Sequence, residues 1–123
     1  MDTVSIRIPA SPAYLQVVRL ISAGLASRLG FTIDEIEDLK IAVDEMCAYL
    51  TGSQGRAGEL QLAFEVDGAR LSIDGKAVLD PGQKVRTDLT ELSKMILSTV
   101  VDSSALELSD GVPTFRLTKT KAL

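Results

Sequence analysis

Residues 3–8 alternate between apolar and polar side chains, which predicts a strand that ends at Pro9. Ser11 can then act as a helix N-cap, and Pro12 suits the first helical position because no intrahelical amide donor is needed there. Apolar residues recur at helical spacing from this point up to a glycine at position 30. The pattern therefore predicts a helix over residues 12–29.

This first helix is apolar over more than one face. Its main stripe consists of Tyr14, Val17, Val18, Ile21, Leu25 and Leu29, and further apolar residues lie beside it, namely Leu15, Leu20, Ala23 and Ala26. A helix this apolar packs on two sides, and exposure of Leu15, Leu20 and Ala23 would leave a sticky patch. Two interpretations stay open: deep burial within one chain, or burial in a two-fold homodimer that also uses the first strand.

A second helix is predicted over residues 33–51. Thr32 and Glu35 have the spacing of a capping box, in which each side chain accepts the backbone N–H of the other residue. The predicted core stripe is Ile36, Leu39, Val43, Cys47 and Leu50, whereas Asp38, Glu45 and Tyr49 occupy the opposite face. Cys47, the only cysteine, therefore reads as a packing residue.

The pattern in the second half of the chain predicts a β-hairpin, a helix and a second β-hairpin. Two alternating segments flank the turn Asp67-Gly68, and a polar connection leads to a third helix that begins at Thr87 or Asp88. The expected ranges are strands at 60–66 and 69–73, a helix at 88–101, and strands at 105–108 and 114–118. The expected core of the third helix is Leu92, Met95, Ile96, Thr99 and Val100.

This element order predicts a single α+β domain over residues 1–123. Hairpins with one apolar face and helices with apolar stripes bury those surfaces against each other in two layers. We expect a two-layer sandwich with three helices on one face of a mixed sheet of about five strands. The opposite face of the sheet should be the more exposed one.

Composition narrows the functional classes. The net charge is −4 and aromatic residues make up 4% of the chain, so neither a basic nucleic-acid footprint nor a base-stacking surface is present. The chain has no histidine, which removes the commonest general base and metal ligand. No apolar run could span a bilayer, no signal-peptide pattern is seen, and the lone cysteine suits a reducing compartment. We expect a cytoplasmic protein with protein partners, no nucleic-acid partner and no membrane association.

The first half of the chain resembles RsbW-type anti-sigma factors, which have the histidine-kinase-like (Bergerat, or GHKL) ATPase fold. Three stretches carry the resemblance: IRIPASPAYL at 6–15, VVRLISAGLASR at 17–28 and EIEDLKIAVDEMC at 35–47. They combine a strand, its turn, a first helix and an acidic second helix in the order typical of that family. The similarity is strong over residues 3–50 and only topological afterwards.

The resemblance also implies where a nucleotide site would lie. The family's second helix carries a catalytic glutamate and, four residues later, an asparagine that holds magnesium. Glu45 matches the glutamate and is the residual catalytic candidate, but Tyr49 stands at the asparagine position and a neutral phenol is a poor magnesium ligand. We therefore expect no bound cofactor and no metal.

Two further motifs depart from the family. Ala77 and Leu79 fall where an adenine-binding aspartate and a glycine belong, although a small shift could use Asp74-Gly75 or the segment 80–82 instead. Segment 88–93 replaces the glycine-rich phosphate loop and contains no glycine. The resemblance thus implies a retained fold with a degenerate ATP site.

Three functions stay open at this point. The leading hypothesis is a binding protein that sequesters a sigma factor and is released by an anti-anti-sigma antagonist. The alternatives are an active serine protein kinase that uses ATP and magnesium, and a regulatory partner of a homologue with no sigma factor of its own. The family's first helix contributes to partner binding, which implies roles for Arg19, Leu15 and Leu20 in contacts with the sigma factor or its antagonist. A homodimer is also expected.

Overall fold

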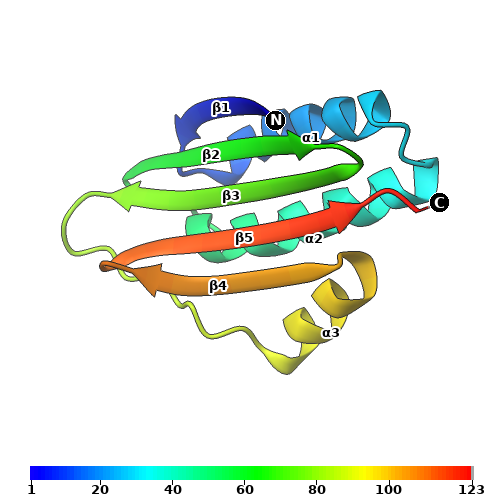
Figure 1. The fold of residues 1–123 in the computed structure, drawn as a ribbon. Coiled ribbons are helices and arrows are strands. Elements are labelled where there is room, and N and C mark those ends of the chain that lie inside the picture. Colours follow the sequence, from blue (N-terminus) through cyan, green and yellow to red (C-terminus); the bar gives the residue numbers. More distant parts are fainter. Residues whose placement is uncertain (123) are drawn as a thin grey trace.

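The computed structural model describes residues 1–122 as a two-layer α+β sandwich, with three helices packed on one face of a five-stranded sheet (Figure 1). The predicted order of strands and helices is confirmed. The elements are β1 (Asp2–Pro9), a 3-10 turn (Pro12–Tyr14), α1 (Leu15–Arg28), α2 (Ile33–Thr51), β2 (Gly58–Asp67), β3 (Arg70–Leu79), α3 (Glu91–Val100), β4 (Ser103–Ser109) and β5 (Val112–Thr120). Within residues 1–122, no helix is both long and apolar enough to cross a bilayer.

The sheet has the order β1-β2-β3-β5-β4, and every neighbouring pair is antiparallel. The expectation of a mixed sheet is therefore wrong. A parallel neighbour would require β4 to lie beside β3, but β5 inserts between them. The connection through α3 instead carries the chain to the outer edge of the sheet, where β4 forms a hairpin with β5.

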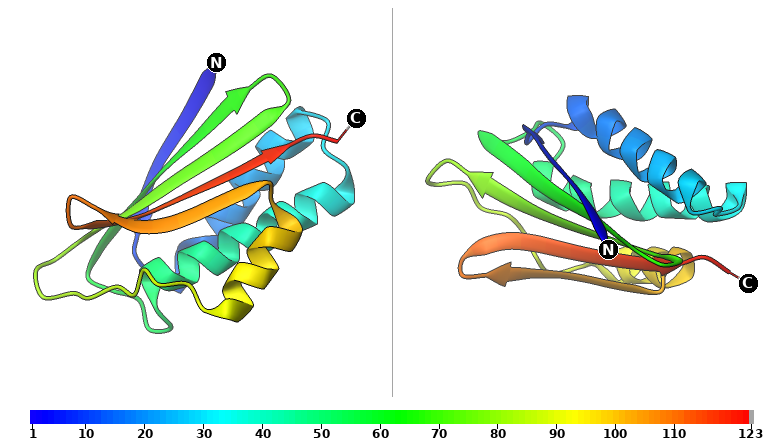
Figure 2. Two further views of the ribbon diagram at one scale, coloured as in Figure 1. Left: turned by 60° about the horizontal axis from the view of Figure 1, so that its bottom comes forward. Right: turned by 45° about the horizontal axis from the view of Figure 1, so that its top comes forward.

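Strand alternation decides which face of the sheet meets the helices. Leu60, Leu62 and Phe64 of β2 and Leu71 and Ile73 of β3 are buried, as predicted. They form the core together with buried side chains of the helices and of β5, whereas the other face of the sheet carries polar residues. Figure 2 shows all three helices on the same side of the sheet.

The N-caps predicted for the first and second helices are present. The Ser11 side chain accepts the Ala13 N–H, and Thr32 and Glu35 form a complete capping box. The second carboxylate oxygen of Glu35 accepts the backbone N–H of Ala122 at 2.8 Å, so the start of α2 also holds the C-terminal segment. The backbone N–H groups of Thr32 and then Ala122 lower the pKa of Glu35. A lowered pKa means that the ionised Glu35 carboxylate stabilises the folded state. This stabilisation is present above the ordinary glutamate pKa and is lost as the pH falls through the lowered pKa of Glu35.

The buried face of the first helix differs from the predicted stripe. Tyr14 and Val17 are exposed, whereas Leu15 is buried in the single chain and Leu20 is 61% exposed. The buried face of α1 follows Leu15, Val18, Ser22 and Ala26 at three- and four-residue spacing, so two small residues lie inward in place of part of the predicted aliphatic stripe. Leu15 therefore needs no second molecule to cover it, so of the two interpretations left open for this residue the structure supports burial within one chain.

The third helix begins later and faces differently than predicted. Its N-cap is Thr90, not Thr87 or Asp88. Leu92 and Met95 are 66% and 64% exposed, and Thr99 is exposed as well, so their assignment to the core is wrong. The buried residues are Ser93, Leu97 and Val100, at the spacing of one helix face. Of the predicted core residues, Val100 is buried and Ile96 is partly buried.

Gly75 allows close cross-strand packing in the middle of the core. It lies opposite Phe115 in the β3–β5 register, and a Cβ atom at position 75 would come within 2.3 Å of the Phe115 ring. The ring thus occupies the space that a side chain on β3 would take. Gly24 on α1 offers a matched control, because no atom lies within 4 Å of the place that its Cβ would take.

We expect Gly75→Ala to lower the free energy of unfolding by about 1–3 kcal/mol, because the added methyl group must displace a buried aromatic ring. Gly24→Ala should raise it by up to about 1 kcal/mol, since alanine is the better helix former. Urea unfolding of both variants measures the two changes. A second substitution, Phe115→Leu, should recover part of the Gly75→Ala loss, and a lack of any recovery would contradict this packing explanation.

Candidate functional site

The candidate site lies on the side of α2 that faces α3. Glu45 and Tyr49 are four residues apart, so their side chains project from the same face of α2, and both are half-buried. The resemblance placed a catalytic glutamate and a magnesium ligand at these two positions. Within the described chain, both side chains contact the first turn of α3 instead.

Three hydrogen bonds join α2 to the start of α3, and a fourth lies within the start of α3 itself. The Thr90 N–H donates to Tyr49 Oη at 3.0 Å, and Tyr49 Oη lies 2.8 Å from Ser93 Oγ. Ser93 Oγ donates to Glu45 Oε2 at 2.6 Å, and Thr90 Oγ1 donates to Ser93 Oγ at 3.0 Å. We call these four residues, Glu45, Tyr49, Thr90 and Ser93, the α2–α3 cluster.

The proton positions in the cluster follow from donor counting. A serine hydroxyl has one proton, and Ser93 gives it to the carboxylate of Glu45. Tyr49 must then donate its own proton to Ser93 Oγ, while it accepts the Thr90 N–H. The result is an ordered chain from Tyr49 through Ser93 to Glu45. Among the described residues, no buried side-chain polar atom lacks a hydrogen-bond partner.

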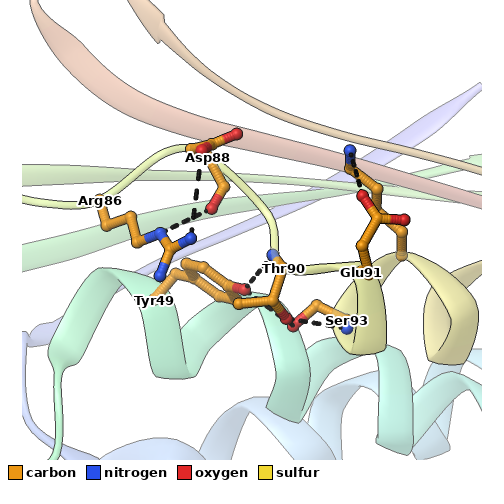
Figure 3. A network of polar contacts seen from close by, with 7 residues as sticks. Tyr49, Arg86, Asp88, Thr90, Glu91 and Ser93 are labelled. Atoms are coloured by element: carbon orange, nitrogen blue, oxygen red, sulfur yellow. Dashed lines mark hydrogen bonds and ion pairs between the residues drawn. The ribbon is translucent and has the colours of Figure 1, made fainter.

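The position of Tyr49 is visible in Figure 3, where its hydroxyl points to the Thr90 backbone and the Ser93 side chain. Desolvation raises the pKa of Tyr49, but its hydrogen bonds with Ser93 and Thr90 outweigh this effect, and the net result is a lowered pKa. The phenol therefore stands where the helix N-terminus provides donors. In an anion-binding site, the same donors would face the ligand.

Arg56 fixes the connection that leads into α3. Its Nε donates to the carbonyl of Leu50 at 3.0 Å, at the end of α2, and its Nη1 donates to the carbonyl of Lys84 at 2.8 Å. Further along, Arg86 Nε donates to the backbone oxygen of Asp88 at 2.8 Å (Figure 3). The connection is thus attached to α2 before α3 begins.

The structure also places the candidate adenine-binding positions. Ala77 is buried on the helix side of β3, whereas Asp74 lies on the open face of the sheet, where Arg116 contacts both of its carboxylate oxygens at 3.0 Å. Burial raises the pKa of Asp74, partly opposed by Arg116. Asp74 therefore points away from α2 and cannot serve the same site as Glu45. Asp80 is exposed at the start of the connection.

A hollow of about 520 Å³ lies beside Ala77, between the end of β3, the connection and the β4–β5 turn. Its lining mixes aliphatic side chains with Asp80, Gln83 and Lys84, and neither Glu45 nor Tyr49 contributes to it. Among residues 1–122, no group of three acidic, cysteine or histidine side chains is arranged to hold a metal ion. Within residues 1–122, the polar groups of the α2–α3 cluster are engaged with one another.

The predicted partner residues lie on α1, on the opposite side of α2. Arg19 Nε donates to Asp44 Oδ1 at 2.6 Å, so this side chain forms an ion pair across the α1–α2 seam. Leu20 is exposed, whereas Leu15 is buried in the core on another face of α1. Cys47 is buried, as predicted, and desolvation raises the pKa of its thiol to about 12.

Sequence reasoning missed Thr90, Ser93, Arg56 and Asp44. One signal was available for the first two, because Thr90 and Ser93 have the three-residue spacing of a helix N-cap and its N3 position. Nothing in the local sequence around Arg56 or Asp44 indicates their long-range partners. These two residues could be found only from the fold.

One solved structure with the same architecture is that of the RsbU and RsbW domains of a Mycobacterium tuberculosis protein. It matches 98% of this chain and 32% of that chain, with a TM-score of 0.68 and 18% sequence identity. The chain therefore has the histidine-kinase-like ATPase fold. The α2–α3 cluster contains the residues at which the sequence resemblance would place nucleotide motifs. No protein-family model matches the sequence.

Sequence relatives define the family. A Bacillus licheniformis serine-protein kinase RsbW is 32% identical over 96% of this chain and 85% of the relative. The Bacillus subtilis serine-protein kinase RsbW is 41% identical over 58% of this chain and 47% of the relative, and that of Bacillus pumilus is 42% identical over 59% and 48%. The chain belongs to the RsbW family. It spans about half the length of several of these relatives.

We expect Tyr49→Phe to destabilise the protein by about 1 kcal/mol, because the cluster loses the hydroxyl that links Thr90 to Ser93. Amide exchange in the first turn of α3 should become faster than in the core of α2. Urea unfolding and hydrogen–deuterium exchange measure these effects. Tyr14→Phe is the matched control, because this tyrosine lies on the surface, and its unfolding free energy should change by less than about 0.5 kcal/mol. Equal effects of the two substitutions would contradict the role of Tyr49.

Proposed function

We propose that this chain is an anti-sigma-type regulator that sequesters a sigma factor and is released when an anti-anti-sigma protein competes for it. We further propose that this exchange proceeds without ATP binding and without phosphorylation. The observation that carries the proposal is the α2–α3 cluster in a member of the RsbW family, because its four residues bond to one another at positions where the sequence resemblance would place nucleotide motifs.

Magnesium and phosphate binding are disfavoured by the cluster. Tyr49 offers a phenol that already donates to Ser93, and it brings no carboxylate or amide oxygen for a hard cation. The α3 N-terminus presents Thr90 and Ser93 to α2 rather than glycine amides to a phosphate, and Glu91 in its first turn adds negative charge. A nucleotide would have to displace these contacts and desolvate Glu45.

The adenine position is also changed. Ala77 brings no carboxylate to the buried end of β3, and Asp74 is held by Arg116 on the other face of the sheet. Each lost charge-assisted contact weakens binding by roughly 1.5–3 kcal/mol. Three such losses remove several orders of magnitude in affinity.

Partner exchange needs only two partners that share one surface. We place that surface on α1, around Arg19 and the exposed Leu20, and we propose that the protein forms a homodimer through neighbouring apolar residues of α1 and β1. Val17 is 41% exposed and Val4 is exposed as well, which supports an apolar contact at this edge. Leu15 is buried, so it contributes to this partner surface indirectly, by packing under the backbone of α1, and does not contact the partner.

The kinase alternative draws support from the relatives, which are named serine-protein kinases. Calorimetry with ATP and magnesium separates the two functions. We expect no heat of binding at millimolar nucleotide, whereas the Bacillus subtilis relative serves as the positive control. Tyr49→Asn alone should not create binding, because segment 88–93 still lacks glycine. A micromolar dissociation constant, or phosphate transfer to an antagonist, would establish the kinase instead.

The partner surface is tested at Arg19. Arg19→Glu would place two carboxylates side by side at Asp44, so Arg19→Gln is the cleaner substitution. We expect Arg19→Gln to change the free energy of unfolding by less than about 1 kcal/mol, as for a partly exposed ion pair. It should weaken binding to the sigma factor at least tenfold by biolayer interferometry, while light scattering reports whether the dimer persists. Unchanged affinity would remove Arg19 from the interface, and a wild-type protein that binds only an RsbW homologue would identify a regulatory partner instead.

A further inference from the structure

We propose that Asp44 is a positioning residue that holds the Arg19 guanidinium in a fixed orientation for a carboxylate of the partner protein. This inference rests on the proposed function and assigns the chemistry of its recognition step. The observation behind it is the contact between Arg19 Nε and Asp44 Oδ1, which joins α1 to α2 at 2.6 Å.

The guanidinium is held at two points. Asp44 accepts the Nε–H, and Gln16, one turn earlier on α1, accepts one Nη1–H at 2.9 Å. Arginine has five N–H donors, so three remain on its two Nη atoms. The Arg19 side chain is 33% exposed. Its polar head is therefore oriented by the protein, and part of it stays accessible to a partner.

A fixed guanidinium binds a carboxylate at lower entropic cost than a free one. A flexible arginine loses rotamer entropy when it is immobilised, and an arginine that is already oriented loses less of it on binding. The two Nη atoms can still donate in parallel to a planar carboxylate. The recognised group is thus an aspartate or glutamate on the partner, approached from outside the α1–α2 seam.

Two exposed apolar residues lie close in sequence to the Arg19–Asp44 ion pair. Leu20 follows Arg19 on α1, and Ile41 precedes Asp44 by three residues on α2, and both are exposed. A central arginine beside aliphatic side chains is typical of the residues that dominate binding energy in protein interfaces. The partner segment should therefore carry an acidic residue next to an apolar one.

A different role for Asp44 makes the opposite prediction. If Asp44 masked the charge of Arg19, its removal would free the cation and strengthen partner binding. If it positions Arg19, removal releases the guanidinium and weakens binding. The two roles are distinguished by the sign of the affinity change, so an alanine substitution tests the inference directly.

We expect Asp44→Ala to weaken binding of the sigma factor about five- to twentyfold, whereas Asp44→Asn, which keeps an oxygen acceptor for Nε–H, should stay within about threefold of the wild type. In the Arg19→Gln background, Asp44→Ala should change affinity by less than twofold, because it acts through Arg19. Each purified sigma factor of the source organism is the probe. Nitrogen-15 spectra of the arginine Nε–H groups follow the loss of orientation without any partner.

The outcomes separate the inference from the proposed function. Equal or tighter binding by Asp44→Ala, or an equal loss in the Arg19→Gln background, overturns the positioning role while the sigma-factor function stands. Unchanged binding by Arg19→Gln also overturns it. If the wild-type protein binds none of the sigma factors, the proposed function fails and this inference fails with it.

Discussion

Hydrogen bonds of the Tyr49, Thr90 and Ser93 hydroxyl groups attach the first turn of α3 to α2. The position of α3, and of the connection that leads into it, depends on this contact. A helix N-terminus leaves backbone donors that need acceptors. Here the acceptors are Tyr49 and the Thr90 side chain, and the carboxylate of Glu45 completes the chain of hydrogen bonds. Because these groups satisfy one another, α3 is held in place without an added molecule.

Helix α2 organises both candidate surfaces because adjacent residues of a helix point about 100° apart. Asp44 is directed to α1, where it meets Arg19, and Glu45 is directed to α3, where it meets Ser93. Ile41 lies one turn before both and is exposed between them. A change in the tilt of α2 would therefore affect the proposed partner surface and the α2–α3 cluster together.

The sequence predicted those features that depend on local spacing. The capping box at Thr32, the alternation of β2 and β3, and the order of all elements follow from contacts between near neighbours in the chain or from faces with period two. The buried face of α3 could not be predicted in this way. Its aliphatic residues Leu92 and Met95 favoured one face, but the hydrogen bonds of Ser93 to residues more than 40 positions away turned another face inward.

The candidate site was predicted in part. The family resemblance located Glu45 and Tyr49 and indicated that the nucleotide motifs had changed, but it did not indicate what replaced them. Asp44 and Lys84, the long-range partners of Arg19 and Arg56, are 25 and 28 residues away from them in the chain, and no local pattern connects these pairs. Long-range pairs of this kind become visible only when the fold brings their helices and loops together.

The self-contained cluster has a consequence for how such a regulator responds in the cell. A protein that is stabilised by a ligand changes its stability and its partner affinity with the ligand's concentration. A site filled by its own side chains has no such dependence, so under the proposed function the cellular energy charge would not enter the response. The concentration of free sigma factor would then depend only on the relative amounts of the regulator, the sigma factor and the antagonist. It would remain low until the antagonist exceeded the available binding sites and would rise steeply beyond that threshold.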